Sequence, residues 1–192
     1  MAGERLVPLF KRLDTLEWKA CNRLARLGAY RPLLFILRWA SRMGDAPAWI
    51  ALCLSLPLVA TPWWYGWFLG VCFGLSAAVG GILYRLLKNR LCRERPYISF
   101  EIPCTMPPLD RYSFPSGHTL HAVMFTTLTA LFAPVLLIVV LPFAVLVALS
   151  RVILGLHYLT DVAAGALIGF LLAQGAALVI LALEAVLFQL LV

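Results

Sequence analysis

Residues 134–154 read PVLLIVVLPFAVLVALSRVIL, and no charged side chain occurs among them before Arg151. A helix needs about 20 mostly apolar residues to cross the hydrocarbon core of a bilayer, so this segment by itself predicts a membrane span. Further apolar segments occur at 46–62, 65–87, 117–132 and 161–191. We therefore predict an all-α fold, a polytopic transmembrane helical bundle of about five spans.

The composition agrees with a membrane protein made of a single domain over residues 1–192. Hydrophobic residues make up 62% of the chain and charged residues 13%, whereas soluble domains average about 45–50% and about 25%. The net charge of +7 is best explained by basic residues that border the helices and face lipid head groups. Since no compact basic domain stands apart from the apolar segments, we expect no nucleic-acid partner.

The N-terminal segment is charged rather than apolar. Residues 1–30 contain nine charged side chains and lack the continuous apolar core of a secretory signal peptide. Their apolar residues recur mostly every three or four positions, which predicts an amphipathic helix at the membrane interface. Residues 31–43 form a further short helix, which Arg31, Arg38 and Arg42 make too charged to span alone. We therefore expect interfacial helices over 1–43.

One long polar segment interrupts the apolar pattern. Residues 91–115 contain five prolines, and a loop of this length in a compact protein is usually functional. Tracing the spans alternately across the membrane brings Lys88, this loop and the segment from Arg151 to Asp161 to one membrane face. Charged residues are costly inside a bilayer, so their convergence on one face indicates a functional site.

The segment after residue 150 offers a histidine and a carboxylate. His157 and Asp161 are four residues apart, so on a helix they would lie on one face. A carboxylate bound to one imidazole nitrogen leaves the other nitrogen free as a nucleophile. The guanidinium of Arg151 suits bidentate phosphate binding. A structural ion pair at a helix end is the alternative interpretation.

A helix start provides a second group of candidates. Pro115 precedes Ser116, Gly117 and His118, whose amides would point at an anion beside the positive end of the helix dipole. His118 is placed to donate a proton to a leaving oxygen. A plain helix start is the alternative, and His121, one turn later, is expected to be structural.

Two cations precede the loop. Lys88 and Arg95 are seven residues apart and would share one face if the helix continued to Pro96. Lysine offers phosphate a point charge, and arginine offers it a planar fork. Cations that reach towards the interface from a helix end are the alternative. The neighbouring arginines Arg85, Arg90 and Arg93 are expected to be such interface-facing cations, without a role in the site.

Together these residues predict phosphoryl transfer. Three cations and the helix-start amides would neutralise the phosphoryl oxygens while one histidine attacks phosphorus and another protonates the leaving group. The acidic residues Glu94, Glu101 and Asp110 are scattered along the loop, and the five cysteines have no metal-ligand spacing. We therefore expect neither a metal nor a cofactor.

The three groups also resemble a known signature. They read Lys88-x6-Arg95-Pro96, Pro115-Ser116-Gly117-His118 and Ser150-Arg151-x5-His157-x3-Asp161. In residue type, spacing and order they resemble the signature of the type-2 phosphatidic acid phosphatase family, relatives of the vanadium haloperoxidases. The resemblance implies a helical membrane phosphatase whose catalytic motifs lie within residues 88–161.

The resemblance implies a role for each matched residue. His157 would be the nucleophile that forms a phosphohistidine, Asp161 its orienting carboxylate, and His118 the general acid. Phosphate would be bound by Lys88, Arg95, Ser116, Gly117, His118 and Arg151. The membrane setting disfavours a haloperoxidase.

The expected function is hydrolysis of a phosphate monoester or diphosphate head group of a membrane lipid. Undecaprenyl diphosphate, phosphatidate and phosphatidylglycerophosphate all fit as substrates. A lipid phosphotransferase and a non-catalytic binder or transporter of anionic lipids are the alternatives. Binding alone needs no nucleophile with an orienting carboxylate, which disfavours the last of these.

The expected location is the cell (inner) membrane, crossed several times. The traced spans put the Lys and Arg residues on or next to the face of the site, which by the positive-inside rule indicates the cytoplasm. Part of that charge, however, is explained by phosphate binding. The resemblance indicates the extracytoplasmic face, and we expect the site there. Cys92 and Cys104 could then pair across the loop.

Overall fold

The computed structural model describes residues 2–100, 102–108 and 110–191, and every regular element within those ranges is helical. In chain order the elements are α1 (Ala2–Arg26), η1 (Leu27–Ala29), α2 (Arg31–Met43), α3 (Pro47–Val59), α4 (Trp63–Leu91), α5 (Pro96–Ser99), α6 (Gly117–Phe132), η2 (Pro134–Leu136), α7 (Leu137–Ile153) and α8 (Leu159–Leu191). The predicted all-α fold is confirmed.

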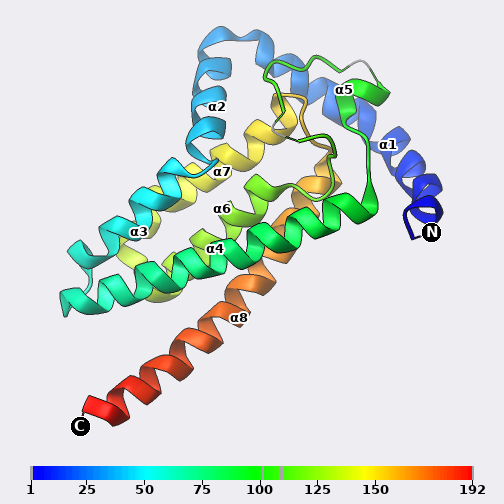
Figure 1. Cartoon of the computed structure of the whole chain (residues 1–192). Helices are drawn as coiled ribbons and strands as arrows, with labels where there is room; N and C mark the ends of the chain where they lie inside the picture. The colour runs from blue at the N-terminus through cyan, green and yellow to red at the C-terminus, as the bar shows by residue number, and fades with distance from the viewer. Residues whose placement is uncertain (1, 101, 109, 192) are drawn as a thin grey trace.

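The two ends of the bundle carry different elements (Figure 1). At one end, α1 and the segment that contains α5 lie beside the C-terminal end of α4 and the turn between α7 and α8. The turn between α3 and α4 and the C-terminus of the chain lie away from that end. The three polar groups therefore meet at one end of the bundle, as the alternating spans predicted.

Helix α6 lies inside the bundle and contacts α4, α7 and α8. Leu120, Met124 and Leu128 recur every fourth residue along it and are fully buried. The approach of α8 depends on glycine, because a Cβ added at Gly165 would lie 2.5 Å from the carbonyl oxygen of Ser116. Small residues allow two helix backbones to come this close, and the starts of α6 and α8 are thereby held side by side.

Three helical segments are long and apolar enough to cross a membrane. They are Trp63–Ser99, Pro134–Ile153 and Leu159–Leu187. Helix α3, with 13 residues, and α6, with 16 residues, are shorter than one span. The bundle also exposes many large apolar side chains, such as Leu75 and Val79 of α4, which suits a lipid-facing surface. A transmembrane bundle is confirmed, and the number of five spans stays a prediction.

The predicted N-terminal helices are present, and α1 packs partly through its apolar residues. Its buried positions are Phe10, Asp14, Cys21 and Ala25, whereas Leu16 is 77% exposed. The helix thus packs a carboxylate against the bundle. The reason is a buried arginine on the loop after α4.

The helix that carries Lys88 does not continue to Pro96. Helix α4 ends at Leu91, and Cys92 takes the left-handed conformation with φ of 49°. Arg95 instead precedes the short helix α5 in extended conformation. The idea that Lys88 and Arg95 share one helical face is therefore wrong, and the chain turns after Cys92 before it reaches Arg95 (Figure 1).

Candidate active site

A polar cavity of about 230 Å³ lies where the three groups meet. Its lining residues are Gly44, Asp45, Tyr84, Arg85, Lys88, Arg95, Asp110, Gly117, His118, His121, Arg151 and His157. Two further predicted residues, Ser116 and Asp161, are fully buried. Ser116 directly precedes the lining residue Gly117, and Asp161 lies 3.5 Å from the lining residue His157. The fold therefore brings together residues from all three groups, which are far apart along the chain.

Three buried cations line this cavity. Lys88, Arg95 and Arg151 are each at most 5% exposed. One Arg95 nitrogen donates to the carbonyl oxygen of Leu156 at 2.7 Å, and Arg151 donates to the hydroxyl of Ser41 at 2.5 Å. Buried charges are costly unless they are paired, so a cluster of three cations is a strong attraction for an anion.

The carboxylate of Asp110, which the sequence did not indicate as a site residue, binds two of these three cations. Both oxygens of Asp110 lie 2.7 Å from Nζ of Lys88, and one lies 2.7 Å from Arg95. Although burial opposes its ionisation, these two cations hold the pKa of Asp110 below its usual value. The loop over 91–115 thus places an anion of its own on two of the predicted phosphate ligands.

His157 and Asp161 are close but are not on one helix. His157 lies in the turn before α8, which begins at Leu159, and its Nδ1 is 3.5 Å from Asp161 Oδ2. The turn is tight because Gly155 has φ of +75°, and the amide of Tyr158 donates to Asp161 Oδ2 at 2.9 Å. The predicted pair is present, although the predicted helical face is wrong.

The electrostatics around His157 favour the neutral imidazole. Burial, and after it the charges of Arg95, Arg151 and Lys88, hold its pKa well below the usual value. A neutral ring keeps one nitrogen lone pair, which is what a nucleophile needs. His157 also lines the cavity, so that lone pair has access to a bound anion.

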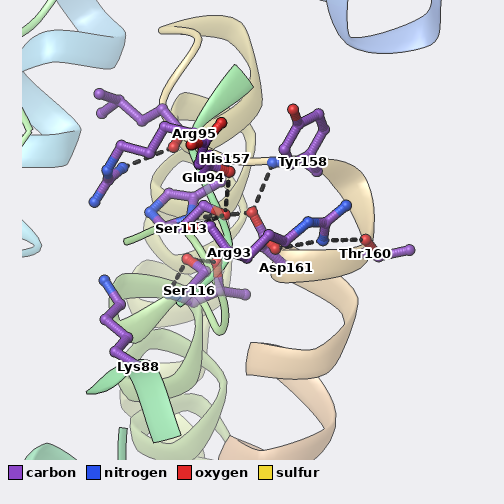
Figure 2. Close-up of polar contacts among 12 residues, drawn as sticks. Lys88, Arg93, Glu94, Arg95, Ser113, Ser116, His157, Tyr158, Thr160 and Asp161 are labelled. Atoms are coloured by element: carbon purple, nitrogen blue, oxygen red, sulfur yellow. Dashed lines mark hydrogen bonds and ion pairs between the residues drawn. The ribbon is translucent and has the colours of Figure 1, made fainter. Parts of the chain in front are cut away.

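Arg93 is not the interface-facing cation that the sequence suggested. Its side chain is fully buried, and it donates to Asp161 Oδ1 at 2.6 Å (Figure 2). It also donates to Asp14 Oδ1 at 2.6 Å. Arg93 follows the left-handed residue Cys92 and is buried, whereas Arg90 on α4 is exposed. One feature of the sequence pointed to this contact. Asp14 is four residues after Phe10, so its carboxylate lies on the same helix face as an apolar residue that has to pack against the bundle.

The start of α6 is used partly as predicted. The Ser116 hydroxyl caps the helix by accepting from the amide of Thr119, but the amide of Ser116 donates to the carbonyl oxygen of Asp161 at 3.1 Å. That amide therefore holds α8 instead of pointing at an anion. The amides of Gly117 and His118 stay the predicted anion donors.

The two histidines of α6 differ in their partners. Nε2 of His118 lies 2.5 Å from a carboxylate oxygen of Asp45, in the loop between α2 and α3. His121 contacts the carbonyl oxygens of Gly117 and Ala77 through its two ring nitrogens, at 2.9 and 3.0 Å. This fits the structural role expected for His121, while Asp45 is a site residue that the sequence did not indicate.

No metal site was expected, and the described residues contain no group of three His, Cys, Asp or Glu side chains placed to hold a metal ion. Cys92 and Cys104 are exposed free thiols.

An all-helical membrane bundle with a buried cationic cavity and two histidines has the features of a membrane enzyme that handles phosphate. The signature of the PAP2 superfamily matches residues 66–184, and the chain belongs to this superfamily. It is a membrane phosphatase of that family.

Characterised relatives and one solved structure are similar to the chain. Decaprenylphosphoryl-5-phosphoribose phosphatase of Mycolicibacterium smegmatis (strain ATCC 700084 / mc(2)155) is 32% identical over 133 residues, which cover 67% of this chain and 68% of that protein. Phosphatidylglycerophosphatase B of Bacillus subtilis (strain 168) is 33% identical over 127 residues, 57% of this chain and 55% of that protein. The crystal structure of a transmembrane PAP2-type phosphatidylglycerolphosphate phosphatase from Bacillus subtilis superposes with a TM-score of 0.59 at 23% identity, covering 92% of this chain and 94% of that one.

Proposed function

We propose that the chain hydrolyses the phosphate or diphosphate head group of a membrane lipid, without a metal ion, through a phosphohistidine on His157. The observation that carries this proposal is the cavity itself, in which the buried cations Lys88, Arg95 and Arg151 surround both candidate histidines. Cations neutralise the charge of a transferring phosphoryl group, which is the main demand of this chemistry.

The steps follow from the contacts. The phosphoryl group replaces the Asp110 carboxylate on Lys88 and Arg95. Nε2 of His157 attacks phosphorus while Asp161 stabilises the ring at Nδ1, and the bond from phosphorus to the lipid oxygen breaks as His118 gives that oxygen a proton. Water, deprotonated by His118, then attacks the phosphohistidine, the bond from nitrogen to phosphorus breaks, and inorganic phosphate leaves.

A lipid substrate is supported by an apolar groove that adjoins the cavity. The groove has a volume of about 330 Å³ and shares Asp45 and His121 with the cavity. Its other lining residues are Ala46, Trp49, Ile50, Cys53, Leu54, Gly70, Gly74, Ala77 and Phe125. Because the groove runs between α3 and α4 from the polar cavity, a head group in the cavity would leave its chain in the groove.

Prenyl phosphates or diphosphates and glycerophospholipids are the two candidate substrate classes. The named relatives act on decaprenylphosphoryl-5-phosphoribose and on phosphatidylglycerophosphate, one from each class. We propose undecaprenyl diphosphate, phosphatidate and phosphatidylglycerophosphate as the first compounds to test. We also propose that the site opens on the extracytoplasmic face of the cell membrane.

The test is phosphate release by the purified protein from a panel of these lipids. We expect release from at least one of them, and we expect His157→Ala to abolish it in a protein that still folds. Substantial release by the folded variant would refute the nucleophile. Reaction in ¹⁸O-labelled water separates hydrolysis from transfer, since only hydrolysis places the label in inorganic phosphate.

The groove has its own test. A Cβ added at Gly74 meets no atom within 4 Å, so Gly74→Leu should fill the groove without disturbing the packing. We expect it to raise KM for a long-chain lipid phosphate and to leave a short-chain, water-soluble phosphate ester unaffected. Gly175→Leu is the matched control, because Gly175 is equally unobstructed and lines a separate groove between α4 and α8.

A further inference from the structure

We propose that Arg93 is a positioning residue for the His157–Asp161 pair, and that the N-terminal helix α1 completes the active site through Asp14 and Glu17. The inference rests on the proposed roles of His157 and Asp161. It adds residues that the motifs do not specify and makes a peripheral helix a part of the catalytic apparatus.

Arg93 connects α1 to the catalytic carboxylate by short contacts. Its Nη1 donates to Asp161 Oδ1 at 2.6 Å and to the Thr160 hydroxyl at 2.7 Å. Its Nε and Nη2 donate to Asp14 Oδ1 at 2.9 and 2.6 Å, and Nη2 lies 3.3 Å from Glu17. The guanidinium therefore bridges α1 and the first turn of α8.

Glu17 makes a second connection between α1 and α8. It accepts from the amide of Thr160 at 2.8 Å through one oxygen and from the Thr160 hydroxyl at 2.6 Å through the other. Asp14 and Glu17 are three residues apart and so lie on the same face of α1. Because Thr160 precedes Asp161 directly, α1 holds the segment that carries the catalytic carboxylate at two points.

The two oxygens of Asp161 have separate partners, which fixes the carboxylate plane. Oδ1 accepts from Arg93, while Oδ2 accepts from the Tyr158 amide and faces Nδ1 of His157 (Figure 2). Without Arg93, a fully buried carboxylate would lose its only cationic partner among the described residues and would favour its neutral form. A neutral or rotated Asp161 cannot hold the His157 ring in the tautomer that attacks.

The surroundings of Arg93 strengthen these bonds. Its guanidinium lies 4.2 Å from the centre of the Tyr158 ring and 5.2 Å from that of Phe10. These rings exclude water from one side each, and electrostatic bonds are stronger where water is excluded. Arg93 is absent from the cavity lining, so its effect on the reaction passes through Asp161.

The experiment compares Arg93→Met and Arg93→Lys in the full-length protein with Arg90→Met, an exposed arginine of α4, as the control. We expect kcat to fall about 10–100-fold in Arg93→Met, by analogy with the loss of an outer partner of a metal-binding histidine. KM and competitive inhibition by vanadate should stay unchanged, because Lys88 and Arg151 are untouched. Arg93→Lys should recover part of kcat, and Arg90→Met should behave as wild type.

The outcomes separate this inference from the proposed function. Phosphate release by folded His157→Ala would refute the proposed function. If His157→Ala is inactive but Arg93→Met has the wild-type kcat, only the positioning role is overturned. A rise in KM with kcat unchanged would also overturn it. If Arg93→Met does not fold, Asp14→Asn decides: a lower kcat at constant KM supports the coupling to α1, and an unchanged kcat refutes it.

Discussion

Asp110 should act as a built-in competitor of the phosphate group, and Asp110→Asn tests this directly. The substitution keeps the shape of the side chain and removes its charge. In the structure the carboxylate makes three contacts of 2.7 Å with Lys88 and Arg95, the same cations that we propose for the substrate. An anion can bind there only by replacing Asp110.

The size of the effect follows from those contacts. Hydrogen bonds to charged groups contribute about 1.5–3 kcal/mol net, and the Asp110 side chain is 37% exposed, so screening favours the low end. A free-energy difference of about 1.4 kcal/mol is a tenfold change in an equilibrium constant. We therefore expect Asp110→Asn to lower the inhibition constants of inorganic phosphate and vanadate by about tenfold.

The assay is competitive inhibition of lipid phosphate hydrolysis in detergent micelles, with each inhibitor titrated against wild type and variant. Glu94→Gln is the matched control, since Glu94 is an exposed acidic residue of the same loop that does not line the cavity. An inhibition constant that is unchanged or higher in Asp110→Asn would show that the carboxylate organises the cations instead of competing for them.

Further predictions concern the histidines, metal dependence and sidedness. His118→Ala should lower kcat/KM, which reports the step that forms the phosphohistidine, about 10²–10⁴-fold with an alkyl phosphate and much less with p-nitrophenyl phosphate; equal losses in kcat/KM would count against a general acid. Because burial and the nearby cations lower the pKa of His157, its ring stays neutral in mild acid, and the acidic limb of kcat/KM should lie below the ordinary histidine value of about 6.5; a limb above that value would contradict the lowered pKa. A chelator should leave activity intact, and loss that magnesium restores would overturn the metal-free mechanism. A membrane-impermeant thiol reagent should label the exposed Cys92 and Cys104 in intact cells; labelling only after the inner membrane is permeabilised would place the site inside.

The convergence of the three motifs could be predicted because the length of each apolar segment indicates whether it can cross the membrane. In the predicted arrangement each apolar segment carries the chain from one face to the other, so Lys88 and the residues around His157 were expected to emerge together. The identity of the cations followed from phosphate chemistry. Neither argument required knowledge of how the helices pack.

The remaining site residues left no comparable pattern. Asp45 and Asp110 are single acidic residues in loops, and their partners follow from loop conformations that composition does not determine. In the sequence Arg93 cannot be distinguished from Arg90. In the structure Arg93 is a buried partner of Asp161 and Arg90 is exposed, and the left-handed turn at Cys92 lies between them. The placement of His157 before α8, rather than within it, depends on the tight turn at Gly155.

Gly165 is a position at which the enzyme cannot tolerate substitution, although it has no chemically active side chain. The missing side chain lets the backbone of α8 rest against that of α6, and the same contact sets the spacing between the segment of His118 and the segment of His157. Even an alanine there would press on the Ser116 carbonyl and push the two histidines apart. In a survey of natural variants, this hydrogen-only position should be as intolerant of change as the histidines themselves, through geometry alone.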